Sequence, residues 1–164
     1  MCKEACPHTP DTMTHAEETE MSSSEIDTFL GQAETGVISF AREGKPYAIP
    51  VSYGYDTDSR TFYLRLVSTP ESGKREFLSD TPQTTLVVYE EVRDTTYRSV
   101  VATGRLQTVD PDELSPDQIA QYGEAKRPLF EMWSAGRAEL DIQLYEFQPA
   151  TLSGRRTAID GEHR

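Results

Sequence analysis

The body of this sequence lacks cysteine and histidine. Its two cysteines are Cys2 and Cys6, and its three histidines are His8, His15 and His163, so all five lie close to one end of the chain. A Cys–His nucleophile pair, a histidine-based zinc centre and an axial haem histidine all need these side chains inside the fold. The sequence therefore predicts none of the three. It also has no P-loop and no dinucleotide fingerprint, so we expect a bound cofactor to carry any chemistry.

Long hydrophobic runs are absent as well. No stretch approaches the roughly 20 apolar residues that span a bilayer, and the N-terminal segment has no apolar centre of the kind that a secretory signal contains. We therefore expect a cytoplasmic protein that does not enter a membrane.

Lysine is scarce, whereas acidic residues are plentiful. Four lysines accompany twelve arginines, and the formal net charge is −12. Such a charge disfavours nucleic acid and anionic lipid surfaces as partners. Scattered acidic residues, with arginine in place of lysine, resemble the proteins of salt-loving archaea, in which salt screens the repulsion between like charges. An ordinary acidic cytosolic protein is the alternative.

Both ends of the chain have compositions typical of disorder. Residues 1–22 and 157–164 are poor in apolar side chains, and the first segment is rich in Thr, Glu and Ser. A metal site formed by Cys2, Cys6, His8 and His15 is an alternative for the leader, but the spacing is not a standard one and no second ligand pair follows. Residues 23–156 are predicted to form one domain, which is long enough to bury a core.

The apolar pattern then changes from helical to alternating. Ser22 and Glu25 form a capping box ahead of apolar residues at helical spacing, which predicts a helix ending at Gly31. Short helices or turns are expected around 74–80, and a longer helix over 115–135. Alternating segments predict antiparallel strands over 36–42, 46–55, 61–67, 83–91, 97–109 and 140–155. About six antiparallel strands with peripheral helices predict a mainly β fold, namely a closed or partly closed barrel.

The strand PYAIPVSYGY has one face made of small residues. Tyr47, Ile49, Val51, Tyr53 and Tyr55 would share the core face, and the opposite face would hold Ala48, Pro50, Ser52 and Gly54. Proline inside a strand belongs at an edge or a bulge, and glycine often marks a close approach by another group. This strip could line a planar ligand. The alternative is an edge strand that proline protects from further pairing.

Residues 65–78, RLVSTPESGKREFL, gather hydroxyls, a glycine and two cations in an acidic chain. Lys74 and Arg75 would begin a short helix, although cations are normally favourable at the opposite end of a helix. A bound anion would compensate them, so we predict that a phosphate is held here. The hydroxyls and backbone N–H groups that could assist are those of Ser68, Thr69, Ser72 and Gly73. A solvated loop with incidental charges is the alternative.

The long strand YRSVVATGR contributes a third candidate element. It places Tyr97 and Ser99 on one side, where the Ser99 hydroxyl could contact a ring rich in heteroatoms. Ordinary pairing within a barrel explains the same pattern, so this strand does not discriminate between the two interpretations.

These segments, in this order, resemble the FMN-binding split barrels, specifically the pyridoxamine 5′-phosphate oxidase-related proteins of the nitroimidazole-resistance type. The resemblance covers about residues 24–109 and is carried by TGVISFAREGKPYAIPVSYGYD, TFYLRLV followed by SGKREFLSD, TTLVVYEE and YRSVVATGRL, with TLSGRR as a weaker match. It implies a split barrel that binds FMN as a homodimer, with the flavin at the subunit interface.

The resemblance also implies which residues contact the flavin. Pro50, Val51 and Ser52 would lie along the isoalloxazine and ribityl chain; Arg65, Val67, Ser68 and Lys74 would surround the ribityl and phosphate; Tyr97 and Ser99 would approach from the long strand. Two departures matter. Residues 125–155 lack the set of Trp, Gly, Arg and His substrate motifs of authentic pyridoxamine phosphate oxidases, and Arg65 stands where the nitroimidazole-resistance branch usually has histidine.

The resulting hypothesis is a flavoprotein oxidoreductase that passes electrons between FMN and a small organic acceptor. No side chain stands out as a catalytic acid or base. Tyr53, Tyr97 and Trp133 could pack near the flavin ring, although aromatic residues more often fill a core. The alternative is a non-catalytic flavin-binding or redox-sensing module.

Overall fold

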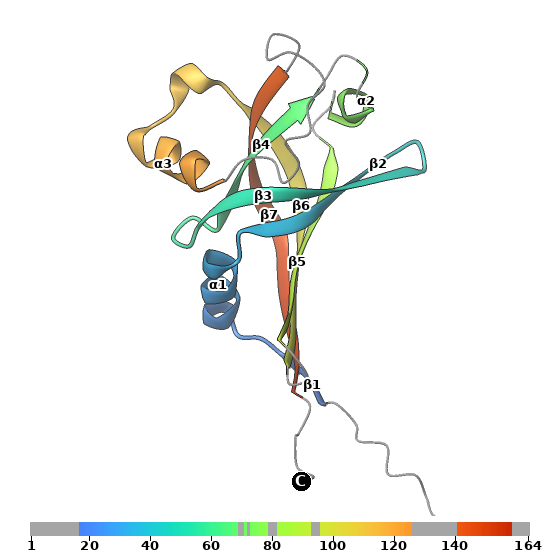
Figure 1. Cartoon of the computed structure of the whole chain (residues 1–164), viewed down its shortest axis with the longest axis vertical. Helices are drawn as coiled ribbons and strands as arrows, with labels where there is room; N and C mark the ends of the chain where they lie inside the picture. The colour runs from blue at the N-terminus through green and yellow to red at the C-terminus, as the bar shows by residue number, and fades with distance from the viewer. Residues whose placement is uncertain are drawn as a thin grey trace, which may run out of the picture.

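The computed structural model describes residues 17–68, 71, 73–78, 82–92, 96–125 and 141–158. Within this part of the chain, antiparallel strands follow the sheet order β1-β7-β4-β3-β2-β5-β6, and a further pairing of β7 with β6 closes the sheet into a barrel (Figure 1). The strands are β1 Glu17–Glu20, β2 Thr35–Arg42, β3 Lys45–Asp56, β4 Thr61–Ser68, β5 Gln83–Val92, β6 Thr96–Val109 and β7 Asp141–Ala158. The predicted mainly β barrel is confirmed.

The tight turn between β2 and β3 follows from two residues. Arg42 pairs with Lys45, so the loop contains only Glu43 and Gly44. Both residues have positive φ angles, 50° and 74°. Positive φ at both central positions is the geometry whose twist matches a β-hairpin. The turn therefore sets the register between β2 and β3.

Helices α1, α2 and α3 lie at the periphery of the barrel (Figure 1), and a short 3-10 helix, Pro111–Glu113, precedes α3. Helix α1, Ser23–Gln32, starts with the predicted capping box and continues past Gly31 to a cap at Ala33. Helix α2, Lys74–Leu78, is a single short turn, and α3, Pro116–Glu124, is capped by Ser115. The second half of the helix predicted over 115–135 lies outside the described residues. No helix among the described residues is long and apolar enough to cross a membrane.

The core fills the barrel and the space under α1. Phe29 from α1 belongs to the same buried cluster as Phe62 and Phe147 from the barrel, and each of the three is at most 2% exposed. The rings of Phe62 and Phe147 lie 5.8 Å apart. Burying a side chain of this size contributes about 1.5–3 kcal/mol. Burial of Phe29 in this cluster holds α1 against the strands.

The ordered structure extends beyond the predicted domain limits of 23 and 156. Strand β1 lies inside the segment predicted to be a disordered leader, and β7 continues to Ala158. Backbone pairing of Glu17–Glu20 with Arg155–Ala158 orders the strand without burying apolar side chains. Glu18 also forms an ion pair with Arg155 at 3.3 Å. Composition predicts hydrophobic burial and does not predict this backbone pairing.

We expect Gly54→Ala to destabilise the fold. A Cβ at Gly54 would lie 2.2 Å from the backbone oxygen of Gln121, so α3 would have to move away from β3. Overpacking of this kind costs about 1–3 kcal/mol, which urea denaturation can measure. Gly123→Ala, in the same helix but with open space around it, is the control and should be neutral or stabilising by about 0.5–1 kcal/mol. Equal effects of the two substitutions would contradict close packing of α3 on β3.

Candidate functional site

The pairing between β3 and β4 is short. Tyr53–Asp56 pair with Thr61–Leu64, whereas the rest of β4 continues alongside β7 as far as Ser68. Along Lys45–Ser52, β3 pairs with β2 on one side, and no β4 residue among those described pairs with the other side. We call this side of Lys45–Ser52 the open edge. It is where the barrel is split.

The backbone of β3 alternates between β2 and the open edge. Tyr53 N–H donates to Glu34 O, at 3.1 Å, just before β2 begins. Because successive residues of an antiparallel strand point their backbone groups to opposite sides, the backbone groups of Ala48, Pro50 and Ser52 point to the open edge. Proline at position 50 therefore removes no hydrogen bond from the β2–β3 ladder. β3 as a whole lies between β2 and β4 in the sheet, but Pro50 lies on the stretch that β4 does not pair with, so the alternative of an edge protected by proline applies to this part of the strand.

Lys74 places its ammonium group where β4 has left β3. Its Nζ donates to Val67 O at 2.9 Å, and Val67 lies on the part of β4 that pairs with β7. The side chain is half-buried, and this burial lowers the pKa of Lys74. An anion beside the ammonium would offset the cost of desolvating it and would raise that pKa again. Lys74 thus has the position and the charge to hold an anionic group.

Helix α2 adds less to anion binding than the sequence suggested. It has five residues, too few to develop the N-terminal dipole of a full helix. Its main contacts are to β2 and β3: Arg42 donates to Glu76 O, and the Phe77 ring stacks on Tyr47 with 5.0 Å between centroids. Arg42 is not among the predicted site residues, because its hydrogen-bond partner lies 34 residues away in the sequence. These contacts position Lys74.

Several other predicted residues surround this place. Ser68, at the end of β4, and Val67 are buried, and Gly73 is exposed beside Lys74. Arg65 donates to Ala125 O at the end of α3, a contact that the sequence did not predict. Thr69, Ser72 and the side chain of Arg75 lie outside the described residues, as do Trp133 and the cysteines and histidines of the termini.

The small-residue strip of β3 divides into two halves. Ala48 and Pro50 are exposed, whereas Gln121 of α3 covers Gly54. Ser52, 8% exposed, lies at the boundary. The strip is therefore available to a ligand only in its first half, and α3 accounts for the close approach predicted at Gly54.

Val51 and Tyr53 belong to the core. Val51 is 6% exposed, its side chain packs in the core, and its backbone groups point to β2, so its predicted contact with the flavin stays a prediction. The Tyr53 hydroxyl donates to Leu30 O at 3.0 Å, and burial raises the pKa of Tyr53. The expectation that Tyr53 packs near a bound ring is therefore not supported by its position.

Tyr97 and Ser99 lie far from Lys74. Tyr97 pairs with Thr157, near β1, and Figure 1 shows β1 and α2 at opposite ends of the molecule. Tyr97 is 44% exposed, and its ring stacks on that of Tyr89 with 6.5 Å between centroids. A single chain therefore does not bring all the predicted site residues together.

The outer side of the barrel carries an uncharged face. Directly paired residues of neighbouring strands point to the same side of a sheet. Following the pairs from strand to strand gives two rows of residues that cross β3, β2, β5, β6 and β7. Their inward neighbours Ile38, Leu86 and Ala102 are at most 1% exposed, so the rows face outward. The rows are Pro50, Val37, Val87, Val101 and Ser153, and Ala48, Ser39, Thr85, Thr103 and Thr151. None of these side chains is charged, in a chain that is 27% charged.

A metal centre has no support in the described part of the chain. No group of three or more His, Cys, Asp or Glu residues there could hold a metal ion. The leader residues considered as metal ligands lie outside it.

A profile of the pyridoxamine 5′-phosphate oxidase family matches residues 22–156. The protein belongs to this family. The match starts at the Ser22 cap of α1 and runs nearly to the end of β7, so the family domain includes β2 to β6 and most of β7 but not β1. A comparison with curated proteins found no significant match.

Solved structures share the fold at low sequence identity. A candidate 5-nitroimidazole antibiotic resistance protein from Bacteroides thetaiotaomicron matches with a TM-score of 0.64 and 16% identity over 96% of this chain and 98% of its own. An FAD-binding protein from Mesorhizobium loti has a TM-score of 0.61 and 21% identity, over 85% and 97%. An FAD-binding protein from Mycobacterium smegmatis has a TM-score of 0.58 and 18% identity, over 85% of this chain and 98% of its own. The barrel is thus the split barrel that these proteins have.

Proposed function

We propose that this protein binds FMN, with the flavin phosphate at Lys74 and the isoalloxazine along the open edge of β3. The observation that carries the proposal is the ammonium group of Lys74, held by Val67 O at the point where β4 separates from β3. Next to it, the backbone groups of Ala48, Pro50 and Ser52 point outward from β3. These can hydrogen-bond to ring heteroatoms or the ribityl chain. Membership of the family, and neighbours named for FAD binding, support a flavin.

FMN and FAD differ in what the phosphate site must hold. FMN carries a single phosphate, which matches one half-buried lysine at the open edge. The two FAD-binding neighbours make FAD the second candidate. A bound flavin would supply the capacity to accept and donate electrons. The chain's own residues would bind and orient it and cover one side of its ring.

We further propose a homodimer whose interface includes the uncharged face. Ten outward side chains without charge are unusual on a chain of net charge −12, and a second copy meeting this face would bury no unpaired charge. Pro50, beside the open edge, lies on this face. Ser99 pairs with Tyr89 two residue pairs beyond the Val87–Val101 pair, so it also faces outward. Tyr97 and Ser99 of the partner subunit would then complete the flavin site, which unites the two groups of predicted residues.

The activity we propose is transfer of electrons between the flavin and a small organic acceptor in the cytoplasm. None of the described residues at the open edge is an evident acid or base, which fits a reaction that the cofactor carries. The same observation supports the alternative, a non-catalytic flavin-binding or redox-sensing module. Sustained reduction of nitro or quinone acceptors with a nicotinamide or reduced deazaflavin donor would establish the enzyme. Flavin binding without turnover of any donor would favour the module.

The proposal predicts that the purified protein is yellow. Its absorption spectrum should show the near-ultraviolet and blue bands of oxidised flavin, and chromatography of the cofactor released by heat should identify FMN. If the released cofactor is FAD, the proposed site stands but its ligand is FAD instead of FMN. A protein that stays colourless after incubation with both flavins would overturn the proposed function.

Replacing Lys74 with methionine should weaken FMN binding by about tenfold or more, because a hydrogen bond to a charged group contributes about 1.5–3 kcal/mol. Quenching of flavin fluorescence during titration measures the affinity. Arg60→Met removes one positive charge from the exposed turn before β4, at the end of that strand opposite Val67, and should leave the affinity unchanged. Equal affinities for the Lys74 variant and the wild type would place the phosphate elsewhere.

Replacing Val101 with glutamate should dissociate the dimer. Val101 lies within the uncharged face and is 36% exposed, so the single chain accepts a charge there, whereas a buried interface does not. Sedimentation velocity gives the oligomeric state, and flavin affinity should fall together with dimerisation. Ile119→Glu, on exposed α3, is the control and should remain dimeric. A wild-type protein that is monomeric while bound to flavin would rule out the proposed interface.

A further inference from the structure

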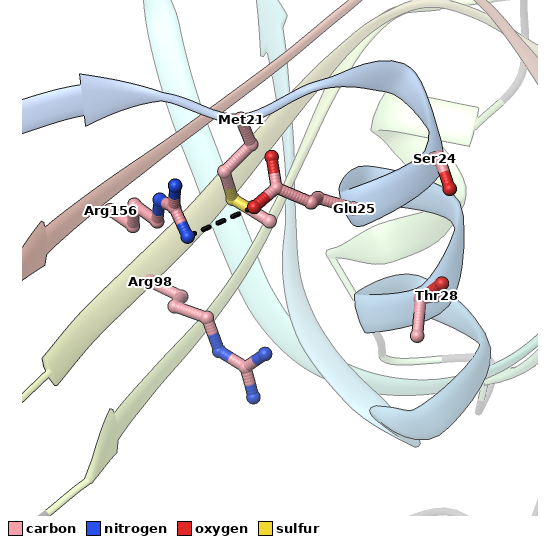
Figure 2. A pocket seen from close by; sticks show the side chains of 6 residues that line it. All are labelled: Met21, Ser24, Glu25, Thr28, Arg98 and Arg156. Atoms are coloured by element: carbon pink, nitrogen blue, oxygen red, sulfur yellow. Dashed lines mark ion pairs between the residues drawn. The ribbon is translucent and has the colours of Figure 1, made fainter.

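A second site candidate lies between α1 and the strands, apart from the proposed flavin site. A cavity of about 200 Å³ is lined by Met21, Ser24, Glu25, Thr28, Arg98 and Arg156 (Figure 2). Ser24, Glu25 and Thr28 come from α1, whereas Arg98 comes from β6 and Arg156 from β7. None of these residues takes part in the binding of flavin as proposed above.

The two arginines are direct cross-strand neighbours. Arg98 pairs with Arg156 in the β6–β7 ladder, so their side chains leave the same face of the sheet. Like charges in this arrangement destabilise a sheet. Each arginine is partly compensated: Arg98 forms an ion pair with Glu90, and Arg156 forms one with Glu25 at 2.9 Å. The cavity itself is nevertheless lined by two cations and one carboxylate, in an acidic protein.

Packing holds Arg98 in place at the cavity. Its guanidinium carbon lies 4.7 Å from the centre of the buried Phe29 ring, a cation–π contact. The side chains of Arg98 and Arg156 are 32% and 47% exposed, so a ligand can reach both. Glu25, in contrast, also accepts a hydrogen bond from Ser22 N–H at 2.7 Å, which ties its carboxylate to the start of α1.

Helix α1 forms the other side of the cavity. Ser24 and Thr28, one helical turn apart, line it together with Glu25, and of these three side chains it is Glu25 that points toward Arg156 (Figure 2). Guanidinium groups and hydroxyls are the donors that recognise phosphate oxygens. The cavity is smaller than the roughly 300–1,000 Å³ of sites for drug-sized ligands. It therefore fits one phosphate-sized group with a short substituent and does not fit a whole nucleotide.

We propose that this cavity binds a phosphate group, either as inorganic phosphate or as the end of a small phosphate ester. The anion would bridge Arg98 and Arg156 and relieve the repulsion between them. It would thereby tie α1 to β6 and β7. Glu25 competes with the ligand for Arg156.

Calorimetric titration of the flavin-saturated protein tests this proposal. Inorganic phosphate and glycerol phosphate are the two probes. Tighter binding of inorganic phosphate would identify the free anion as the ligand, and tighter binding of glycerol phosphate would identify an ester. Arg98→Gln and Arg156→Gln should each weaken binding by about tenfold or more, as expected for loss of a charge-assisted hydrogen bond. Arg155→Gln is the matched control: Arg155 is the neighbouring residue in β7, does not line the cavity, and should leave binding unchanged.

Glu25→Gln distinguishes phosphate binding by Arg98 and Arg156 from a purely structural role of these arginines. Glutamine at this position keeps the capping box of α1, but the competing carboxylate is gone. Phosphate should then bind about two- to fivefold more tightly, as expected for release of an exposed ion pair. Because Arg98 also packs on Phe29, thermal melts check the folding of its variant, and the Arg156 and Glu25 variants decide the result if it unfolds.

Three outcomes would overturn the proposal. The first is the absence of saturable binding of either probe by the wild type. The second is unchanged binding in both the Arg156 and Glu25 variants. The third is binding of the probe by the flavin-free protein that disappears once the protein is saturated with flavin, which would assign the anion to the flavin site.

Discussion

The separation of β4 from β3 is the constraint on which the rest of the site depends. Backbone groups that leave a ladder need other partners, since each unpaired buried group costs free energy. Two residues reduce this cost. Lys74 Nζ supplies a donor to Val67 O, and Pro50 carries no N–H that would need an acceptor. The barrel can therefore stay split along Lys45–Ser52 while β4 continues alongside β7.

Separate side-chain contacts hold α2 and α3 in place on the two sides of the gap between β3 and β4. On one side, stacking of Phe77 on Tyr47 and the hydrogen bond from Arg42 to Glu76 O keep α2 against β2 and β3. On the other, α3 covers Gly54 and receives the hydrogen bond of Arg65 at Ala125 O. These contacts hold the helix that carries Lys74 against β2 and β3, and they cover the Gly54 half of the β3 strip. The geometry of the open edge thus follows from how two peripheral helices are fastened.

The distribution of charge divides the surface into parts with different chemistry. The rows through Val37 and Ser39 carry no charged side chain across five strands. On the opposite face of the same strands, Arg98 and Arg156 lie next to each other under α1. A chain with 28 acidic and 16 basic residues therefore has one region suited to another protein surface and one suited to an anion. Their separation to the two sides of the sheet follows from the two-residue period of a strand.

Local patterns in the sequence were enough to predict the strands and the capping box at Ser22, because each depends on residues that are close along the chain. They also indicated Lys74, since a cation beside serines and a glycine is unusual in this composition. Only the tertiary structure decided that the β3–β4 pairing stops at the Tyr53–Leu64 pair. It also decided that Arg65 donates to Ala125 O, sixty residues away, and that β1 pairs with β7. It also placed Ser99 at the other end of the molecule from Lys74 and set Arg98 opposite Arg156. These facts depend on which distant strands pair and in which register, and alternation along one strand does not carry that information.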